Sequence, residues 1–252
     1  MANAYWIRRA EENEEFAAKM ARQASKRMKQ LHKDTYKTLK DMCDKLQLKV
    51  NSGETLTRSE LWRMKEYVEL MNGVKKECDH IAVGEIEELT QTLDKAFDQT
   101  IHRTADQLKT SITEEATIQL KEQLLKSHWA GSNYSDRIWH NTEALKEKLE
   151  KHITDYIMTG KNPTVALSEE LGVSYRQADR VVRTETAYIQ TKASVEGYKT
   201  AGIEEVEFIA ESDCCKECEK YSGRTFVIGH EPLIPVHPNC RCCLAPIVKR
   251  HE

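Results

Sequence analysis

The distribution of proline constrains the fold of this chain more than any other feature of its sequence. No proline occurs before Pro163, and all five prolines lie from that point onward. Glycine is also sparse early, with only Gly53, Gly73 and Gly84 before Gly131. Proline and glycine are the residues that most often interrupt helices, and the stretch without them is rich in Glu, Lys, Gln, Leu and Ala. The sequence therefore predicts a mainly α protein with long helices.

Apolar spacing and capping residues divide the chain into helices. The first long helix is expected at about 5–46; its narrow apolar stripe requires other helices or another subunit to pack against. After a break at 51–53, Thr57 and Glu60 form a capping-box pattern at the start of a second helix, which has Met64 on its apolar face. Further helices are expected at about 83–127, 136–159, 163–171 and 174–200, the last two separated at Gly172.

Composition excludes some classes of protein and leaves others open. No run of 18 apolar residues occurs, so no membrane span is expected. The N-terminus lacks an apolar signal core, so export by that route is not expected. The net charge is only -3, but residues 1–50 hold twelve Lys/Arg and seven Asp/Glu, a local charge of +5. Such a basic arm suits contact with DNA or docking on an acidic protein.

Six of the eight cysteines lie in the last 39 residues, in a pattern typical of a metal site. Cys215 and Cys218 form a C-x-x-C pair, and His237 and Cys240 form an H-x-x-C pair further on. Two thiolates three residues apart can bind one metal from a tight turn, and a second pair completes the tetrahedral shell of Zn²⁺. Cys242 is the alternative fourth ligand. Four protein ligands leave no open position, so the predicted zinc is structural.

Short strand-like runs bracket the two cysteine pairs. Residues 206–209 and 225–228 are rich in β-branched and aromatic side chains. Because this stretch is too short to form a large hydrophobic core, a bound metal would supply much of its folding free energy. The sequence predicts a small α+β, zinc-knuckle-like module at 206–247. The competing interpretation is that the cysteines are buried or free and bind no metal.

A domain boundary is expected near residue 130. Residues 129–135 combine glycine with small polar turn formers. The sequence thus predicts an elongated long-helix region at 1–130, suited to docking on partners, and a second domain at 131–252 that contains the metal-stapled module.

Several elements of the C-terminal half, taken in order, resemble a known family. They are Arg183-Thr184-Glu185 on a helix, Tyr198 and Gly202, Asp213 before the C-x-x-C pair, Gly223-Arg224-Thr225-Phe226, and Pro235-Val236-His237-Pro238-Asn239-Cys240-Arg241-Cys242. In this order they resemble the C-terminal domain of phage head morphogenesis proteins, the minor capsid family that includes the Mu F-like proteins. The resemblance is sharpest over 174–246.

This resemblance implies a structural protein of the virion and not an enzyme. Such proteins are made in the cytoplasm of the bacterial host and lie inside the head at the portal vertex, in few copies. They bind the portal protein and assist procapsid assembly and DNA packaging or ejection. Scaffold protein, major capsid protein and, non-specifically, packaged DNA are further expected partners.

The charged residues of the motif have expected structural roles. Arg183 and Glu185 lie two residues apart on a helix, so they face different directions and form no direct ion pair. Glu185 is expected to accept hydrogen bonds from backbone donors near the metal. Arg241 is expected to bind a carboxylate such as Asp213, the alternative being a DNA phosphate.

Two other functions stay open at this point. The helices at 163–171 and 174–200 match a helix-turn-helix, with residues 174–177 entering the major groove of DNA. However, the second helix is too long for that module, and acidic residues offset its arginines. A cysteine-dependent enzyme is the other alternative, although a cysteine held by zinc is not a free nucleophile. No G-x-S-x-G, P-loop or H-E-x-x-H motif occurs.

Overall fold

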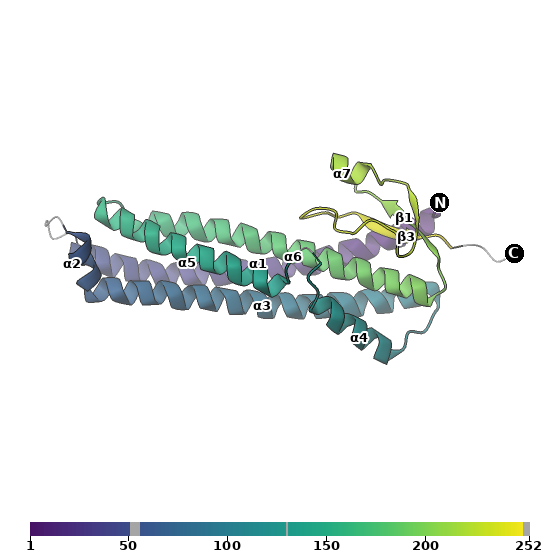
Figure 1. The fold of residues 1–252 in the computed structure, drawn as a ribbon, viewed down its shortest axis with the longest axis horizontal. Helices are drawn as coiled ribbons and strands as arrows, with labels where there is room; N and C mark the ends of the chain where they lie inside the picture. The colour runs from purple at the N-terminus through teal and green to yellow at the C-terminus, as the bar shows by residue number, and fades with distance from the viewer. Residues whose placement is uncertain (51–55, 130, 249–252) are drawn as a thin grey trace. The chain divides into compact units, whose positions relative to one another are not determined.

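The computed structural model describes residues 1–50, 56–129 and 131–248, and within these ranges the protein is mainly helical with one small sheet (Figure 1). This confirms the predicted fold class, a mainly α chain with a cysteine-rich α+β module at its C-terminal end. No helix in the described ranges is long and apolar enough to cross a membrane. The elements are α1 (Ala4–Val50), α2 (Arg58–Arg63), α3 (Lys65–Leu108), α4 (Glu114–Leu125), α5 (Tyr134–Met158), α6 (Pro163–Thr200), β1 (Glu205–Ile209), α7 (Lys216–Glu219), β2 (Thr225–Val227) and β3 (Cys243–Pro246).

The start of α2 is the capping box that the sequence predicts. The Thr57 hydroxyl accepts a hydrogen bond from the Glu60 N–H, and the Glu60 carboxylate accepts one from the Thr57 N–H at 2.7 Å. The helix ends early, because Met64 adopts an extended backbone with ψ of 130°. A single second helix through Met64 is therefore wrong. The predicted break at 51–53 lies outside the described residues.

Two further predicted helix boundaries are wrong. Helix α3 is continuous through residue 83 and ends at Leu108, so the expected run to residue 127 is divided between α3 and α4. Helix α6 is continuous through Gly172, where a Cβ atom would meet only Arg176 Nη1, at 3.7 Å. Glycine inside a helix costs only about 1 kcal/mol, which packing of the neighbouring turns can offset. The alternative interpretation of this segment as a helix-turn-helix therefore lacks its turn.

The chain folds into two compact units, each assembled from separate stretches of sequence. We call one of them the sheet unit, which comprises Met1–Ala24, Leu89–Trp129 and Arg180–Glu252. We call the other the bundle unit, which comprises Ser25–Glu88 and Ala130–Asp179. Helices α1, α3 and α6 contribute residues to both units, and the domain boundary expected near residue 130 stays a prediction.

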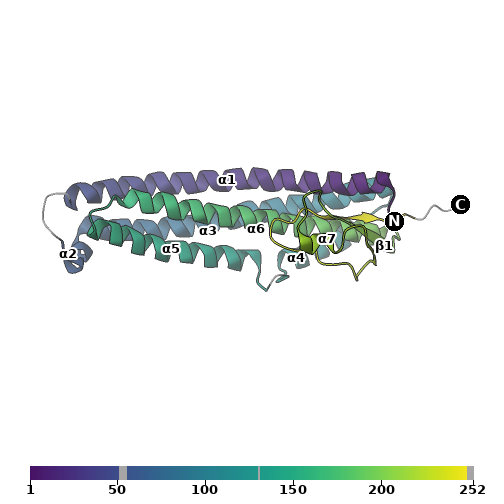
Figure 2. The same ribbon diagram turned by 90° about the horizontal axis from the view of Figure 1, so that it is seen from above.

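The core of the bundle unit lies between segments of α1, α3, α5 and α6, which run side by side (Figure 2). Apolar residues recur every three or four positions on each segment, as Leu145, Leu149 and Ile153 do on α5, so that one face of each helix is buried. The same core contains Leu39 and Leu46 of α1, which are fully buried.

The sheet of the sheet unit is antiparallel, with strand order β2-β1-β3. Val206 of β1 lies opposite Phe226 of β2, and Phe208 lies opposite Leu244 of β3. The sequence predicts β1 and β2, and both are confirmed. It does not predict β3, because its cysteine and Pro246 are weak strand signals, although a proline is tolerated on an edge strand.

The two faces of the sheet pack against different helices. Phe208 and Leu244 join a buried cluster with Tyr198 of α6, whose hydroxyl donates to the Leu244 carbonyl at 3.0 Å. On the other face, Cys243 packs against Ala10, near the N-terminal end of α1, beside which β1 and β3 lie in Figure 1. This alternation follows from the two-residue period of a strand. The module is thus held between two helices.

Candidate metal centre

The first pair of predicted ligands is held by a single helical turn. Cys215 is the N-cap residue of α7, and Cys218 lies three residues later in the same short helix. The backbone carbonyl of Cys215 accepts a hydrogen bond from the Glu219 N–H at 3.0 Å, which closes the turn. Because residues three apart in a helix are neighbours on its surface, the C-x-x-C spacing brings the two sulfurs together.

The second pair is held by a tight turn that is anchored on α6. The Cys240 N–H donates to the His237 carbonyl at 3.1 Å, and Asn239 between them has a φ of 64°. Asparagine tolerates this left-handed conformation better than most residues. The Asn239 N–H donates to the Thr184 hydroxyl at 3.1 Å. The R-T-E motif on the helix and the H-P-N-C motif in the turn are therefore in direct contact.

The ligand atoms form two overlapping groups, and within each group all atoms lie within 4.8 Å of one another. The first group is Cys215, Cys218 and His237, and the second is Cys218, Cys240 and Cys242. Cys218 belongs to both groups, and its sulfur lies 3.7 Å from that of Cys240. Two sulfurs that bind one zinc ion at about 2.3 Å in tetrahedral geometry are about 3.8 Å apart. The cluster of Cys218, Cys240 and Cys242 can therefore hold a metal ion.

The structure brings together every residue of the predicted ligand set and its alternate. Neither group contains all four predicted ligands, and the sulfurs of Cys240 and Cys242 both lie within 4.8 Å of that of Cys218. The choice between Cys240 and Cys242 as the fourth ligand therefore stays a prediction.

The remaining cysteines have structural surroundings of their own. Cys243 points to the opposite face of the sheet and packs against α1, and Cys214 packs at the edge of the apolar cluster. Cys43 and Cys78 lie in the core of the bundle unit, where burial raises the pKa of each thiol to about 12. All eight cysteines are free thiols.

Electrostatics favour thiolate at part of the cluster. A hydrogen bond from Cys242 is the main cause that lowers the pKa of Cys240 to about 5, whereas burial raises the pKa of Cys218 to about 12. Backbone hydrogen bonds, first from Cys218, lower the pKa of the exposed Cys215. Since metals bind the thiolate, a centre with some thiols already ionised is prepared for a cation, whose charge would ionise the rest.

The ring of His237 is oriented by its own neighbour. Its Nδ1 lies 2.9 Å from the Pro238 carbonyl oxygen, which can only accept, so Nδ1 carries the proton. This contact is also the main cause that raises the pKa of His237. Nε2 is then the nitrogen with a free lone pair. Metal-binding histidines are commonly oriented in this way, by a carbonyl that accepts from the other ring nitrogen.

The motif residue Glu185 has a side-chain partner that the sequence does not predict. Its carboxylate accepts a hydrogen bond from the Trp129 indole at 2.9 Å, and the expected bonds to backbone donors near the cysteines stay a prediction. The indole also stacks on Tyr188, with ring centroids 4.5 Å apart. Glu185 therefore fixes the segment that follows α4 against α6.

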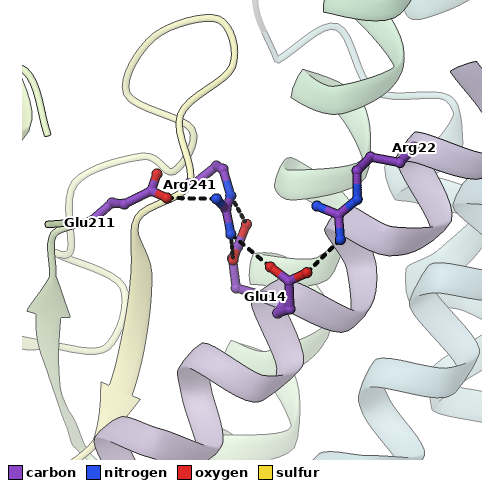
Figure 3. A network of polar contacts seen from close by, with 5 residues as sticks. Glu14, Arg22, Glu211 and Arg241 are labelled. Carbon is purple, nitrogen blue, oxygen red and sulfur yellow. Dashed lines mark hydrogen bonds and ion pairs between the residues drawn. The ribbon is translucent and has the colours of Figure 1, made fainter. Parts of the chain in front are cut away.

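Arg241 binds carboxylates, as expected, but the expected partner Asp213 is wrong. Its guanidinium donates to Glu14 at 3.1 Å, to Glu15 at 2.8 Å and to Glu211 at 2.6 Å (Figure 3). Among the described contacts, none joins it to Asp213. A guanidinium with three carboxylate partners is poorly available for a DNA phosphate.

Sequence reasoning missed the acidic residues of this network. Glu14 is buried, and burial raises the pKa of its carboxyl although Arg241 opposes that rise. Arg22 of α1 also pairs with Glu15. The run Glu11-Glu12-Asn13-Glu14-Glu15 was the available signal, but a cluster of acids at a helix start is usually solvated.

The motif residue Arg183 lines a small cavity next to the second cysteine pair. The cavity has a volume of about 80 Å³ and also takes in Asn239, Cys240 and Arg241. The cavity thus lies between Arg183 and the turn of Asn239, which is hydrogen-bonded to Thr184. The R-T-E motif therefore faces the second cysteine pair.

Comparisons with known proteins give no match. No family model matches the chain, and no curated protein and no solved structure does either. The candidate centre therefore has to be judged on its own geometry.

Proposed function

We propose that this chain is a minor structural protein of a bacteriophage head, without enzymatic activity. In this proposal it lies inside the virion at the portal vertex, binds the portal protein, and assists procapsid assembly and DNA packaging or ejection. Scaffold or major capsid protein would be further partners, and packaged DNA a non-specific one.

The contact between Thr184 and Asn239 is the single observation that carries the proposal. The resemblance to head morphogenesis proteins rests on separated motifs, and this 3.1 Å hydrogen bond joins two of them. Tyr198 and the strand after the H-P-N-C-R-C element are joined in the same way. The separated motifs therefore meet in one structural unit, which supports the proposal.

A structural Zn²⁺ ion is part of the proposal. Zn²⁺ prefers thiolate sulfurs and imidazole nitrogens as ligands. The separation of 3.7 Å between the sulfurs of Cys218 and Cys240 suits tetrahedral coordination. Cys215, Cys218 and His237 would bind it, together with Cys240 or, as the alternative, Cys242. A closed shell would act as a cross-link that holds α7 and the second turn together.

One observation favours a cysteine-dependent enzyme as the second candidate. Cys215 is exposed, and its sulfur lies within 4.8 Å of a ring nitrogen of His237. A thiol beside a histidine is the arrangement of many cysteine nucleophiles. Metal binding by these two residues would exclude it. The DNA-binding alternative has lost its main support, because α6 has no turn at Gly172.

The direct test is co-assembly with the portal protein encoded by the same phage. We expect the wild-type chain to co-sediment with portal-containing procapsids, and Cys218→Ser with Cys240→Ser to abolish incorporation. Cys214→Ser is the matched control and should be incorporated normally, because Cys214 belongs to neither ligand group. A folded, metal-loaded chain that does not associate with portal or procapsids would contradict the proposal.

The cysteine-enzyme candidate predicts a different result. Alkylation of Cys215 with iodoacetamide should then occur readily in the purified protein and leave the fold intact. In the structural proposal, zinc protects Cys215 or its neighbours until a chelator is added.

A further inference from the structure

A groove on the bundle unit lies between α1 and α6 and includes none of the clustered cysteines. Its volume is about 390 Å³. The lining residues come from one face of each helix: Lys29, His32, Lys33, Tyr36 and Lys37 from α1, and Ser168, Leu171, Gly172 and Tyr175 from α6.

The rim of the groove is positively charged. Lys29, Lys33 and Lys37 follow one another at four-residue spacing on the exposed side of α1, and no acidic residue lines the groove. Asp34, on the same helix, pairs with Lys37 at 3.5 Å and offsets part of this charge. Lys29 lies over the ring of Tyr175, at 5.4 Å from its centroid. Three cations thus stand along about two turns of helix beside an aromatic wall.

The floor of the groove is apolar. Leu171 is buried, and the rings of Tyr36 and Tyr175 are half-buried. Gly172 leaves open space, because a Cβ atom there would meet only the end of the Arg176 side chain, at 3.7 Å. A concave apolar strip of this kind fits a row of apolar side chains from a partner.

His32 lies at the base of the groove but is engaged within the protein. Its two ring nitrogens lie 3.0 Å from the Met28 carbonyl and 3.1 Å from the Ser174 hydroxyl. Burial lowers its pKa, so the ring is neutral near pH 7. The positive charge of the groove therefore comes from the three lysines.

We propose that this groove binds an acidic amphipathic helix of a partner protein. Its apolar residues would lie over Leu171 and Gly172, and its carboxylates would face the lysine row. Helix-in-groove binding places the partner's apolar anchors at three- and four-residue spacing, and carboxylates at four-residue spacing beside them would match the lysine row on α1. DNA is the less suitable occupant, since binding of phosphates gains nothing from an apolar floor. The inference does not depend on the proposed phage function.

A defined peptide tests this proposal on the full chain. The probe is a fluorescent helical peptide with leucines at i, i+3, i+4 and i+7 and glutamates at the flanking positions; the matched peptide has glutamine for glutamate. Fluorescence anisotropy should show the acidic peptide binding at least about tenfold more tightly, since its glutamates add several ion pairs with the lysine row.

Two variants and one control locate the binding. Gly172→Leu should fill the groove and abolish binding, with an unchanged or higher Tm, because leucine is a better helix former than glycine. Lys33→Glu should weaken binding about fivefold or more. Lys45→Glu, an exposed lysine of α1 that does not line the groove, should have little effect.

Three results would overturn the proposal. One is equal binding of the glutamate and glutamine peptides, and another is unchanged binding by Gly172→Leu. The third is tight, salt-sensitive binding of a DNA duplex that Lys33→Glu weakens and Gly172→Leu does not, which would assign the lysine row to nucleic acid.

Discussion

Arg241 and Glu14 form a two-bond ion pair although they lie 227 residues apart in the sequence. The guanidinium Nε donates to one carboxylate oxygen and Nη2 to the other, both at 3.1 Å. Arg241 stands between two cysteines of the candidate metal centre, and Glu14 lies near the start of α1. The pair therefore links the conformation of the second cysteine turn to the first helix of the chain.

Arg241→Ala should destabilise the sheet unit by about 3 kcal/mol, because it leaves the buried Glu14 carboxylate without its cation. Adding Glu14→Gln to this variant should recover much of the loss, since the uncompensated charge is then gone. Arg8→Ala, at an exposed position of α1, is the matched control and should change stability by less than about 0.5 kcal/mol. Denaturant unfolding measures all three.

The same variant has a predictable pH dependence. Burial already raises the folded-state pKa of Glu14 above its ordinary value, and loss of Arg241 should raise it further. Where the pKa of a carboxyl is higher in the folded than in the unfolded state, the protein loses stability as the pH rises through the folded-state pKa. The Arg241→Ala defect should therefore be largest at neutral pH and shrink as Glu14 takes up its proton in acid. A defect that is constant with pH would show that the charge of Glu14 is not its cause.

Two glycines of the same helix should respond oppositely to alanine. A Cβ at Gly197 would lie 2.6 Å from Thr104 Cγ2 of α3, so Gly197→Ala forces α3 and α6 apart and should cost about 1–3 kcal/mol. Gly172→Ala meets no such contact and should be neutral or stabilising by up to about 1 kcal/mol. Thermal melting of the two variants compares them. Equal effects would contradict the packing of α6 against α3.

Much of the fold follows from local sequence signals. The long helices follow from missing breakers and periodic apolar residues, and the α2 capping box from Thr57 and Glu60. The residues of the candidate metal centre follow from C-x-x-C and H-x-x-C spacing, because a turn of either kind brings its two ligands together before any tertiary contact is made.

The rest depends on tertiary contacts that no local pattern contains. Gly172 looks like a helix end, yet α6 continues, because Leu167 and Leu171 before it are buried in the bundle core. Strand β3 forms because β1 offers it a free edge, not because its residues favour strands. The partners of Arg241 could not be predicted, since three acidic residues from two distant segments converge on it only in the folded chain.

Glu85 should make the stability of the bundle unit fall with rising pH. Burial raises its pKa to about 8, and its Oε1 has no hydrogen-bond partner among the described residues. The folded state holds this proton more tightly than the unfolded state, so stability is lost between about pH 4.5 and pH 8. Glu85→Gln, which stays neutral, should gain about 4 kcal/mol over wild type at pH 8 and almost nothing at pH 4.

An exposed glutamate of the same helix provides the control for this prediction. Glu87→Gln should show no such pH-dependent gain. Urea unfolding at several pH values gives the comparison. If the gain of Glu85→Gln did not grow with pH, the carboxyl would be ionised in the folded state and His32, 3.5 Å away, would be its partner.

Chelation should unfold the module locally and leave the helices in place. With EDTA, the amides of β1 and β3 should lose hydrogen-exchange protection, because the metal supplies the cross-link between α7 and the second cysteine turn. Amides of α5 in the bundle unit should keep their protection. The same loss should appear as pH falls, since protonation of the thiolates competes with metal binding.

The most direct test of the account is the zinc content of the purified chain, measured by native mass spectrometry. We expect one zinc ion per chain in wild type and in Cys214→Ser, and none in the Cys218→Ser/Cys240→Ser double variant. A wild-type chain that folds, resists unfolding by EDTA and carries no metal would contradict the account, because its cysteine cluster would then be neither a zinc site nor the cross-link that holds the module.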